Sequence, residues 1–131
     1  MSGYLLDTSV IIDYLRKKSL VIEFVDGLEE DVYSSFVCLA ELYVGVFRDA
    51  NPIKAEQTLN VYSQGLTEIL GLNQEVTRHF GEIIANLYKI AQPIGEMDAL
   101  IAATCIANDL TLVTKNAKHF YKIPGLRLLA L

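Results

Sequence analysis

Short runs of apolar residues alternate along this chain with longer stretches in which apolar residues recur every three or four positions. The short runs have the length of buried strands, and the recurring spacing is typical of helices that bury one face. The predicted strands are residues 3–6, 31–35, 66–70, 111–114 and 126–131. The predicted helices are residues 8–17, 20–28, 36–47, 53–63, 73–91, 97–108 and 117–121.

Strands that alternate with helices predict an α/β three-layer sandwich, with a short central parallel sheet flanked by helices. Polar residues mark several predicted helix starts: Thr8 or Ser9 is placed to cap the first helix, and Asn73 the fifth. In open parallel sheets, ligands bind beyond the carboxyl ends of the strands. Asp7 lies at such an end, and so does the segment "TKN", residues 114–116.

The composition limits the class of protein. With 131 residues we expect one domain, 1–131, with a core of its own. Hydrophobic residues make up 52% of the chain, slightly above the roughly 45–50% of an average domain, which favours a homodimer that covers an apolar face. No stretch reaches the ~20 apolar residues of a membrane span, and Asp7 interrupts the N-terminal run that a signal peptide would need. We therefore expect a cytoplasmic protein with no membrane partner, in which Cys38 and Cys105 are small buried thiols.

Three acidic residues stand alone in apolar surroundings. Asp7 is the only charged residue in residues 1–12, Glu41 in 32–47, and Asp98 in 97–108. A buried, isolated carboxylate costs several kcal/mol, so such groups are paired, metal-bound or protonated. Because no basic partners lie nearby in the sequence, we expect the three carboxylates to face one another around a hard divalent cation. Mg²⁺ suits such oxygen donors, and Mn²⁺ is compatible with them.

Each of these acids also has a simpler explanation. Asp7 could cap the first helix, Glu41 could face solvent, and Asp98 could stabilise the first turn of its helix through the helix dipole. The conjunction of the three favours the metal site, because two of them lie at predicted strand-to-helix junctions on the expected edge of the sheet. Asp13 is expected to face solvent, and Glu96 could cap its helix or support the site through a water molecule.

The blocks "LLDTSVIIDYL", "SSFVCLAELYVGV" and "IGEMDALIAATCIANDLTLVTKNAKHF" together resemble the PIN-domain ribonucleases, in particular the VapC-type toxins of toxin–antitoxin pairs. The resemblance covers essentially the whole chain. It implies a PIN-like fold and a Mg²⁺-dependent endoribonuclease that a cognate antitoxin neutralises. The family's acidic positions fall on Asp7, Glu41 and Asp98 of this sequence.

The resemblance also implies supporting residues. Thr8 or Ser9 matches the hydroxyl that often follows the first acid of the family. Asn116 stands where many members have a fourth acid, and its amide can still offer a carbonyl oxygen. One negative charge fewer should weaken a second metal site.

The net charge of −5 argues against nonspecific binding of nucleic acid. Arg16, Lys115 and Lys118 nevertheless follow the first helix and the last inner strand, where they could hold an RNA backbone on either side of the acidic pocket. Two alternatives remain open: a catalytically weak PIN-fold module for interaction or RNA processing, and a receiver-type phosphotransfer domain. The second expects a phosphoacceptor Asp directly after a middle strand, and the segments 31–35 and 66–70 supply none.

Overall fold

A computed structural model describes residues 2–131, and its centre is a sheet of five parallel strands in the order β3-β2-β1-β4-β5. The strands are β1 (Tyr4–Leu6), β2 (Val32–Ser35), β3 (Glu68–Leu70), β4 (Thr111–Thr114) and β5 (Arg127–Ala130). The helices are α1 (Thr8–Leu15), α2 (Ser19–Asp26), α3 (Phe36–Arg48), α4 (Pro52–Gln64), α5 (Gln74–Lys89), α6 (Glu96–Ala107) and α7 (Ala117–Phe120). Every predicted element is present, and the bounds differ by a few residues at most.

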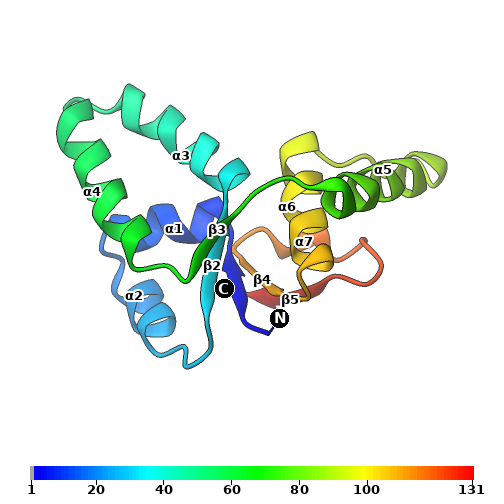
Figure 1. Cartoon of the computed structure of the whole chain (residues 1–131), viewed down its shortest axis with the longest axis horizontal. Helices are drawn as coiled ribbons and strands as arrows, with labels where there is room; N and C mark the ends of the chain where they lie inside the picture. Colours follow the sequence, from blue (N-terminus) through cyan, green and yellow to red (C-terminus); the bar gives the residue numbers. More distant parts are fainter. Residues whose placement is uncertain (1) are drawn as a thin grey trace.

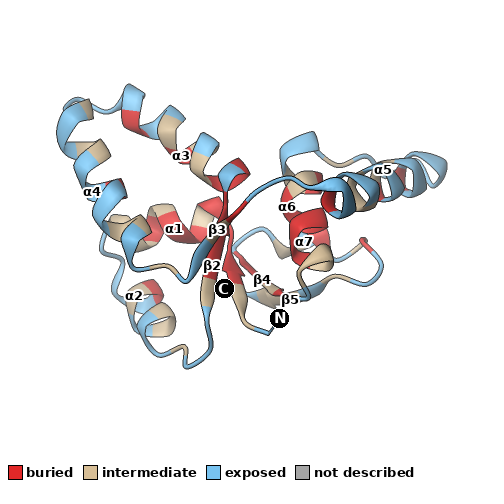
Figure 2. Ribbon diagram, in the orientation of Figure 1, coloured by how far each residue is buried: buried red, intermediate tan, exposed pale blue. Residues whose placement is uncertain are grey.

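Helices cover the sheet on both faces. Figure 1 shows α1, α2 and α4 on one side of the strands and α5, α6 and α7 on the other. Because successive strand residues point to opposite faces, Leu5 packs into the core beneath α5 and α6, whereas its neighbour Leu6 packs into the core beneath α1 and α4. Burial is concentrated in the strands and in the helix faces turned toward them (Figure 2). The predicted three-layer α/β sandwich is confirmed.

The strand order places the carboxyl ends of β1 and β4 next to each other. The chain first builds outward from β1 to β2 and β3, and then returns to the other side of β1 with β4 and β5. Leu5 pairs with Leu112, and Leu6 with Val113. In open parallel sheets such a reversal leaves a crevice at the carboxyl edge, and α1 begins there directly after β1.

Gly3 allows β1 to enter the sheet. Its φ of 135° lies in a region that side chains disfavour. A Cβ at this position would lie 2.5 Å from the carbonyl oxygen of Asp31, which is far inside van der Waals contact. The amide of the next residue, Tyr4, donates to that same carbonyl at 3.0 Å. The close approach of the two chain segments therefore requires glycine.

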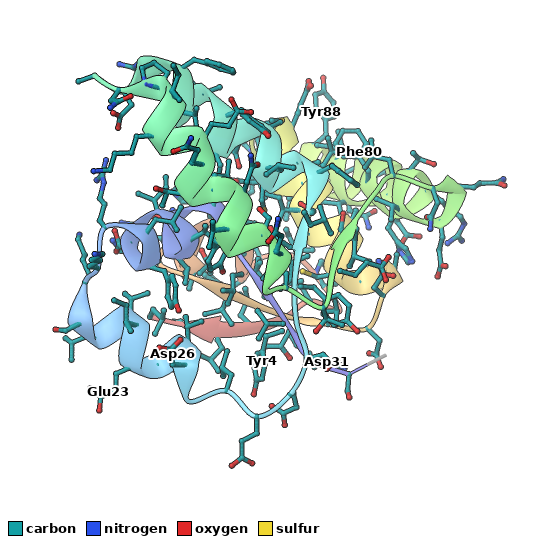
Figure 3. All side chains as sticks on the ribbon, turned by 60° about the vertical axis from the view of Figure 1, so that its left-hand side comes forward. Tyr4, Glu23, Asp26, Asp31, Phe80 and Tyr88 are labelled. Carbon is teal, nitrogen blue, oxygen red and sulfur yellow. The ribbon has the colours of Figure 1, made fainter. Side chains whose placement is uncertain are left out.

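Other contacts fasten the outer helices. The Tyr14 hydroxyl of α1 donates to the carboxylate of Asp26 on α2 at 2.8 Å, and Figure 3 labels Asp26 on that helix.

Cys38 and Cys105 are unpaired and fully buried, as expected, and burial raises the pKa of both thiols. Within residues 2–131, no helix has the length and apolar character that crossing a bilayer demands.

Candidate metal-dependent active site

Asp7 is held in place at the junction of β1 and α1. Its carboxylate is buried, with 4% of the residue exposed, and Oδ1 accepts a hydrogen bond from the Thr8 amide at 2.8 Å. Asp7 is therefore the N-cap of α1, which confirms the alternative that this residue caps the first helix, and the prediction that Thr8 or Ser9 caps it is wrong. The physical reason is that Asp7 has extended backbone angles whereas Thr8 is already helical, so only the Asp7 side chain lies outside the first turn.

Thr114, the last residue of β4, supplies the second contact to Asp7. Its hydroxyl donates to Asp7 Oδ2 at 2.7 Å and accepts from the Asn116 amide at 3.0 Å. Thr114 is fully buried. Thr114 belongs to the segment 114–116 that was expected at this edge of the sheet, but no role was predicted for its side chain. The available signal was a hydroxyl residue at the end of an otherwise apolar strand whose carboxyl end lies at the expected edge.

Glu41 is brought to Asp7 through Thr8. The Thr8 hydroxyl donates to Glu41 Oε1 at 2.6 Å, which joins α1 to the middle of α3. Ser9 makes a longer contact of 3.4 Å from its hydroxyl to Asp7 Oδ2. The alternative in which Glu41 simply faces solvent is not supported, because Glu41 is half-buried and bonded to a neighbouring helix.

Asp98 lies in the first turn of α6, with 31% of its side chain exposed. His119 Nδ1 of α7 lies 3.7 Å from Asp98 Oδ2, which places one of the two histidines at the edge of the site. The N-cap of α6 is Gly95, so the alternative that Glu96 caps this helix is wrong. The Glu96 side chain is exposed at the start of α6, and its supporting role remains a prediction.

The carboxylates influence one another electrostatically. Burial is the main cause that raises the pKa of Asp7; the hydrogen bonds from Thr114 and Thr8 oppose it, and the charge of Asp98 adds to it. Burial also raises the pKa of Glu41, against the hydrogen bond from Thr8, and the charges of Asp7 and Asp98 raise it further. The fold thus places the charges of neighbouring acids near Asp7 and Glu41, where they add to the effect of burial on the pKa of each.

The donor chemistry of this site fits a divalent cation. Asp7, Glu41 and Asp98 offer carboxylate oxygens, and neither Asp7 nor Glu41 has an ion-pair partner among the described residues. Burial and, to a lesser extent, the neighbouring carboxylate charges raise the pKa values of Asp7 and Glu41, and a bound cation would favour the ionised forms of both. In residues 2–131 as they stand, no three His, Cys, Asp or Glu side chains are already arranged to hold one ion.

The basic residues next to the site are arranged differently from the prediction. Asp13 is buried with 4% exposure, so the expectation that it faces solvent is wrong. Its carboxylate forms ion pairs with Lys115 and, at 3.2 Å, with Lys18. The Lys115 ammonium is therefore engaged within the protein, which counts against its predicted contact with RNA phosphate. Arg16 and Lys118 are exposed and remain candidates for that contact.

Two hollows of the described surface are lined by none of the three acids. One, of about 340 Å³, is lined by α1, α3 and α4 and includes Ile12, Leu42 and Val46. A second, of about 500 Å³, lies between α1, α2, β2 and α4. Both are bordered mainly by apolar surface. The chemistry of the three carboxylates, rather than the size of a cavity, therefore identifies the candidate active site.

Comparison with known proteins identifies the family of this chain. The family described as PIN domain matches residues 4–126. The chain belongs to the PIN-domain family. The match includes the three lone acids and the β4–α7 turn, so the resemblance noted from the three sequence blocks is confirmed.

Curated PIN-domain relatives match nearly the whole chain. Ribonuclease VapC1 of Rickettsia felis is 36% identical over 97% of this chain and 95% of its own length. Ribonuclease VapC1 of Methanocaldococcus jannaschii is 34% identical over 93% of this chain and 82% of its own length. This chain is thus similar to VapC proteins of both a bacterium and an archaeon.

Solved structures of PIN-domain proteins superpose closely. A chain of VapBC2 from Rickettsia felis, bound to a DNA fragment from its promoter, gives a TM-score of 0.92 at 28% identity, with 98% of both chains covered. A chain of DNA-bound VapBC from Salmonella typhimurium gives 0.91 at 26% identity, with 99% of this chain and 98% of the other covered. The PIN-like arrangement of strands and helices is therefore shared along the whole length.

Proposed function

We propose that this PIN-domain protein is a Mg²⁺-dependent endoribonuclease that acts as the toxin of a toxin–antitoxin pair. The observation that carries the proposal is that Asp7, Glu41 and Asp98 lie near enough at the carboxyl edge of the sheet for the charges of neighbouring acids to raise the pKa values of Asp7 and Glu41, while neither of these two has a basic partner among residues 2–131. The curated relatives are ribonucleases, which supports RNA as the substrate class.

Each acid has a distinct place in the proposed reaction. Asp7 and Asp98 would hold Mg²⁺, or Mn²⁺ as a substitute, and Glu41 would bind it or orient a water molecule. When bound, the ion polarises the scissile phosphate and lowers the pKa of an attacking water. Thr8 keeps Glu41 turned toward Asp7 through its hydroxyl, and Thr114 fixes the rotation of the Asp7 carboxylate. Asn116 would contribute its amide oxygen at the rim of the site.

We also infer a cognate antitoxin and a homodimer as partners. The structural neighbours are VapBC assemblies, which supports an antitoxin. The two hollows beside α1 and α4 offer apolar surface of the kind that a partner segment covers. Exposed apolar side chains such as Val44 and Phe47 on α3 and Tyr88 on α5 support contact with a second copy.

Cleavage of defined RNAs, with and without Mg²⁺ or Mn²⁺, tests the proposal. The purified chain should produce discrete ends, located by sequencing, only when the ion is present. Asp7→Asn should lower the cleavage rate by more than about 100-fold, beyond what the loss of a supporting residue usually costs at a metal site. Glu23→Gln is the matched control, because Glu23 is an exposed carboxylate on α2 (Figure 3).

Cleavage that persists in excess chelator, or that survives Asp7→Asn, would refute the metal mechanism. A wild-type chain that binds RNA but never cuts it in the presence of either ion would favour the alternative of a catalytically weak interaction module.

A further inference from the structure

The ion pair between the buried carboxylate of Asp13 and the ammonium of Lys115, whose side chain is 39% exposed, joins two segments that are far apart in the sequence. Asp13 lies in α1, and its side chain is only 6% exposed. Lys115 follows β4, 102 positions later. Because a buried carboxylate is costly without a partner, this contact strongly restricts where the residue after β4 can lie. The β4–α7 turn is thereby fastened to the side of α1.

That turn carries two groups of the candidate active site. Lys115 stands between Thr114 and Asn116. The Thr114 hydroxyl donates to Asp7 Oδ2 at 2.7 Å, and the backbone amide of Asn116 donates to the Thr114 hydroxyl at 3.0 Å. Asp7 caps the same helix that holds Asp13. Two contacts therefore join α1 to the β4–α7 turn. Thr114 bonds to Asp7 at the start of the helix, and Lys115 pairs with Asp13 further along it.

We propose that the Asp13–Lys115 ion pair is a positioning device that holds the β4–α7 turn against α1 and keeps Thr114 and Asn116 aligned with Asp7. Lys115 acts through its neighbours and touches neither substrate nor ion. The inference rests on the proposed nuclease function for its kinetic consequence, whereas its structural consequence can be measured without that function.

An ion pair with a buried partner generally contributes little to the free energy of unfolding, since apolar replacements of similar volume are often neutral or stabilising. Its best attested use is to select one geometry among several. The present pair occurs where geometry matters, one residue from the hydroxyl that orients Asp7. Loosening it by even a fraction of an ångström would leave the fold intact and the site misaligned.

Lys18 provides a matched control. Its ammonium lies 3.2 Å from the other oxygen of the same carboxylate, and 54% of its side chain is exposed. Lys18 is the N-cap of α2, however, and therefore makes no link to the turn. Lys18→Met and Lys115→Met each remove one positive charge and one ion pair from Asp13 and leave the other in place. Only the second releases the β4–α7 turn.

The experiment compares these two variants with Lys115→Arg, which retains the charge. Lys115→Met should lower kcat for RNA cleavage by about 10–100-fold, as the loss of residues that support a metal site does, with KM unchanged within about twofold. Lys115→Arg should restore most of kcat, and Lys18→Met should stay close to wild type. Thermal unfolding of each variant confirms that it is folded.

Hydrogen exchange of the backbone amide of Asn116 supplies a readout that does not depend on activity. This amide donates to the Thr114 hydroxyl, so Lys115→Met should speed its exchange at least about tenfold relative to Lys18→Met. If the wild type cuts no RNA but the exchange responds as expected, the positioning role stands and the nuclease proposal fails. Equal exchange in both variants overturns the inference. So does a rise in KM at constant kcat, which would indicate direct contact of Lys115 with phosphate.

Discussion

Replacing Thr114 with valine tests how the buried carboxylate of Asp7 is stabilised. Valine has nearly the shape of threonine, so the change removes one hydroxyl and leaves packing intact. Two hydrogen bonds disappear. In one, the Thr114 hydroxyl donates to Asp7 Oδ2 at 2.7 Å; in the other, it accepts from the backbone amide of Asn116 at 3.0 Å. The first of these serves a carboxylate that is buried beside β4, where water cannot easily replace it.

The expected loss follows from the charge on Asp7. A hydrogen bond to a charged group contributes about 1.5–3 kcal/mol, so at neutral pH Thr114→Val should lower the free energy of unfolding by about 2–3 kcal/mol. For a chain of 131 residues, each kcal/mol shifts Tm by roughly 3–4 °C. The melting temperature of the metal-free protein should therefore fall by about 6–12 °C.

The loss should depend on pH in a defined direction. Burial already raises the pKa of Asp7, and the Thr114 hydrogen bond is the main contact that holds it down. The variant raises the pKa of Asp7 further, so more stability is lost as the pH climbs from the unfolded value of about 3.9 through the raised value in the folded state. Below that window Asp7 is protonated in both proteins, and the deficit should shrink to about 1 kcal/mol.

Urea unfolding in excess chelator, between pH 4 and 8, measures this dependence. Thr114→Ser is the control, because it keeps the hydroxyl and loses only a methyl group. The reasoning is refuted if serine and valine cost the same stability, or if the deficit of the valine variant is as large at pH 4 as at pH 8.

Two other substitutions test the electrostatics of the site and the entry of β1. In metal-free protein at pH 7, Asp7→Asn should raise Tm, because it removes a buried carboxylate whose pKa is raised, while asparagine can still cap α1. The gain in Tm should vanish toward pH 4. A lower Tm of the variant at pH 7 would contradict the argument. Mg²⁺ at about 100 times its Kd should stabilise the wild type by about 2.7 kcal/mol and leave Asp7→Asn unchanged in differential scanning calorimetry. Gly3→Ala should destabilise the fold, since its Cβ would lie 2.5 Å from a carbonyl oxygen, whereas Gly81→Ala, in open space within α5, should stabilise it by up to about 1 kcal/mol. Similar Tm values for the two alanine variants would show that the contact at Gly3 can relax.

The local elements were predictable because each leaves a periodic trace in the sequence. The stretch 97–108 is apolar around its circumference, and α6 is indeed buried on nearly all sides. The predicted cap at Asn73 is confirmed, since its side chain accepts from the backbone amide of Val76 at 2.9 Å. Helix starts are local events, so the sequence carries most of the information about them.

The candidate acids were predictable for a different reason. A lone carboxylate in an apolar segment must be compensated by something distant, and this requirement is visible without coordinates. It singled out Asp7, Glu41 and Asp98, but it said nothing about which neighbours would compensate them. The same argument failed for Asp13. Basic residues follow it closely in the sequence, so its charge did not stand alone, and its burial was not predicted.

The sequence by itself determined the order and type of the elements and the residues that carry the acidic chemistry. Only the tertiary structure decided that β4 lies beside β1, that Thr114 supports Asp7 and that Lys115 pairs with Asp13. Those contacts join residues about a hundred positions apart. Hydrophobic periodicity reports only which side of an element is buried, whereas a partner across the sheet is chosen by strand order and side-chain direction, which exist only once the chain has folded.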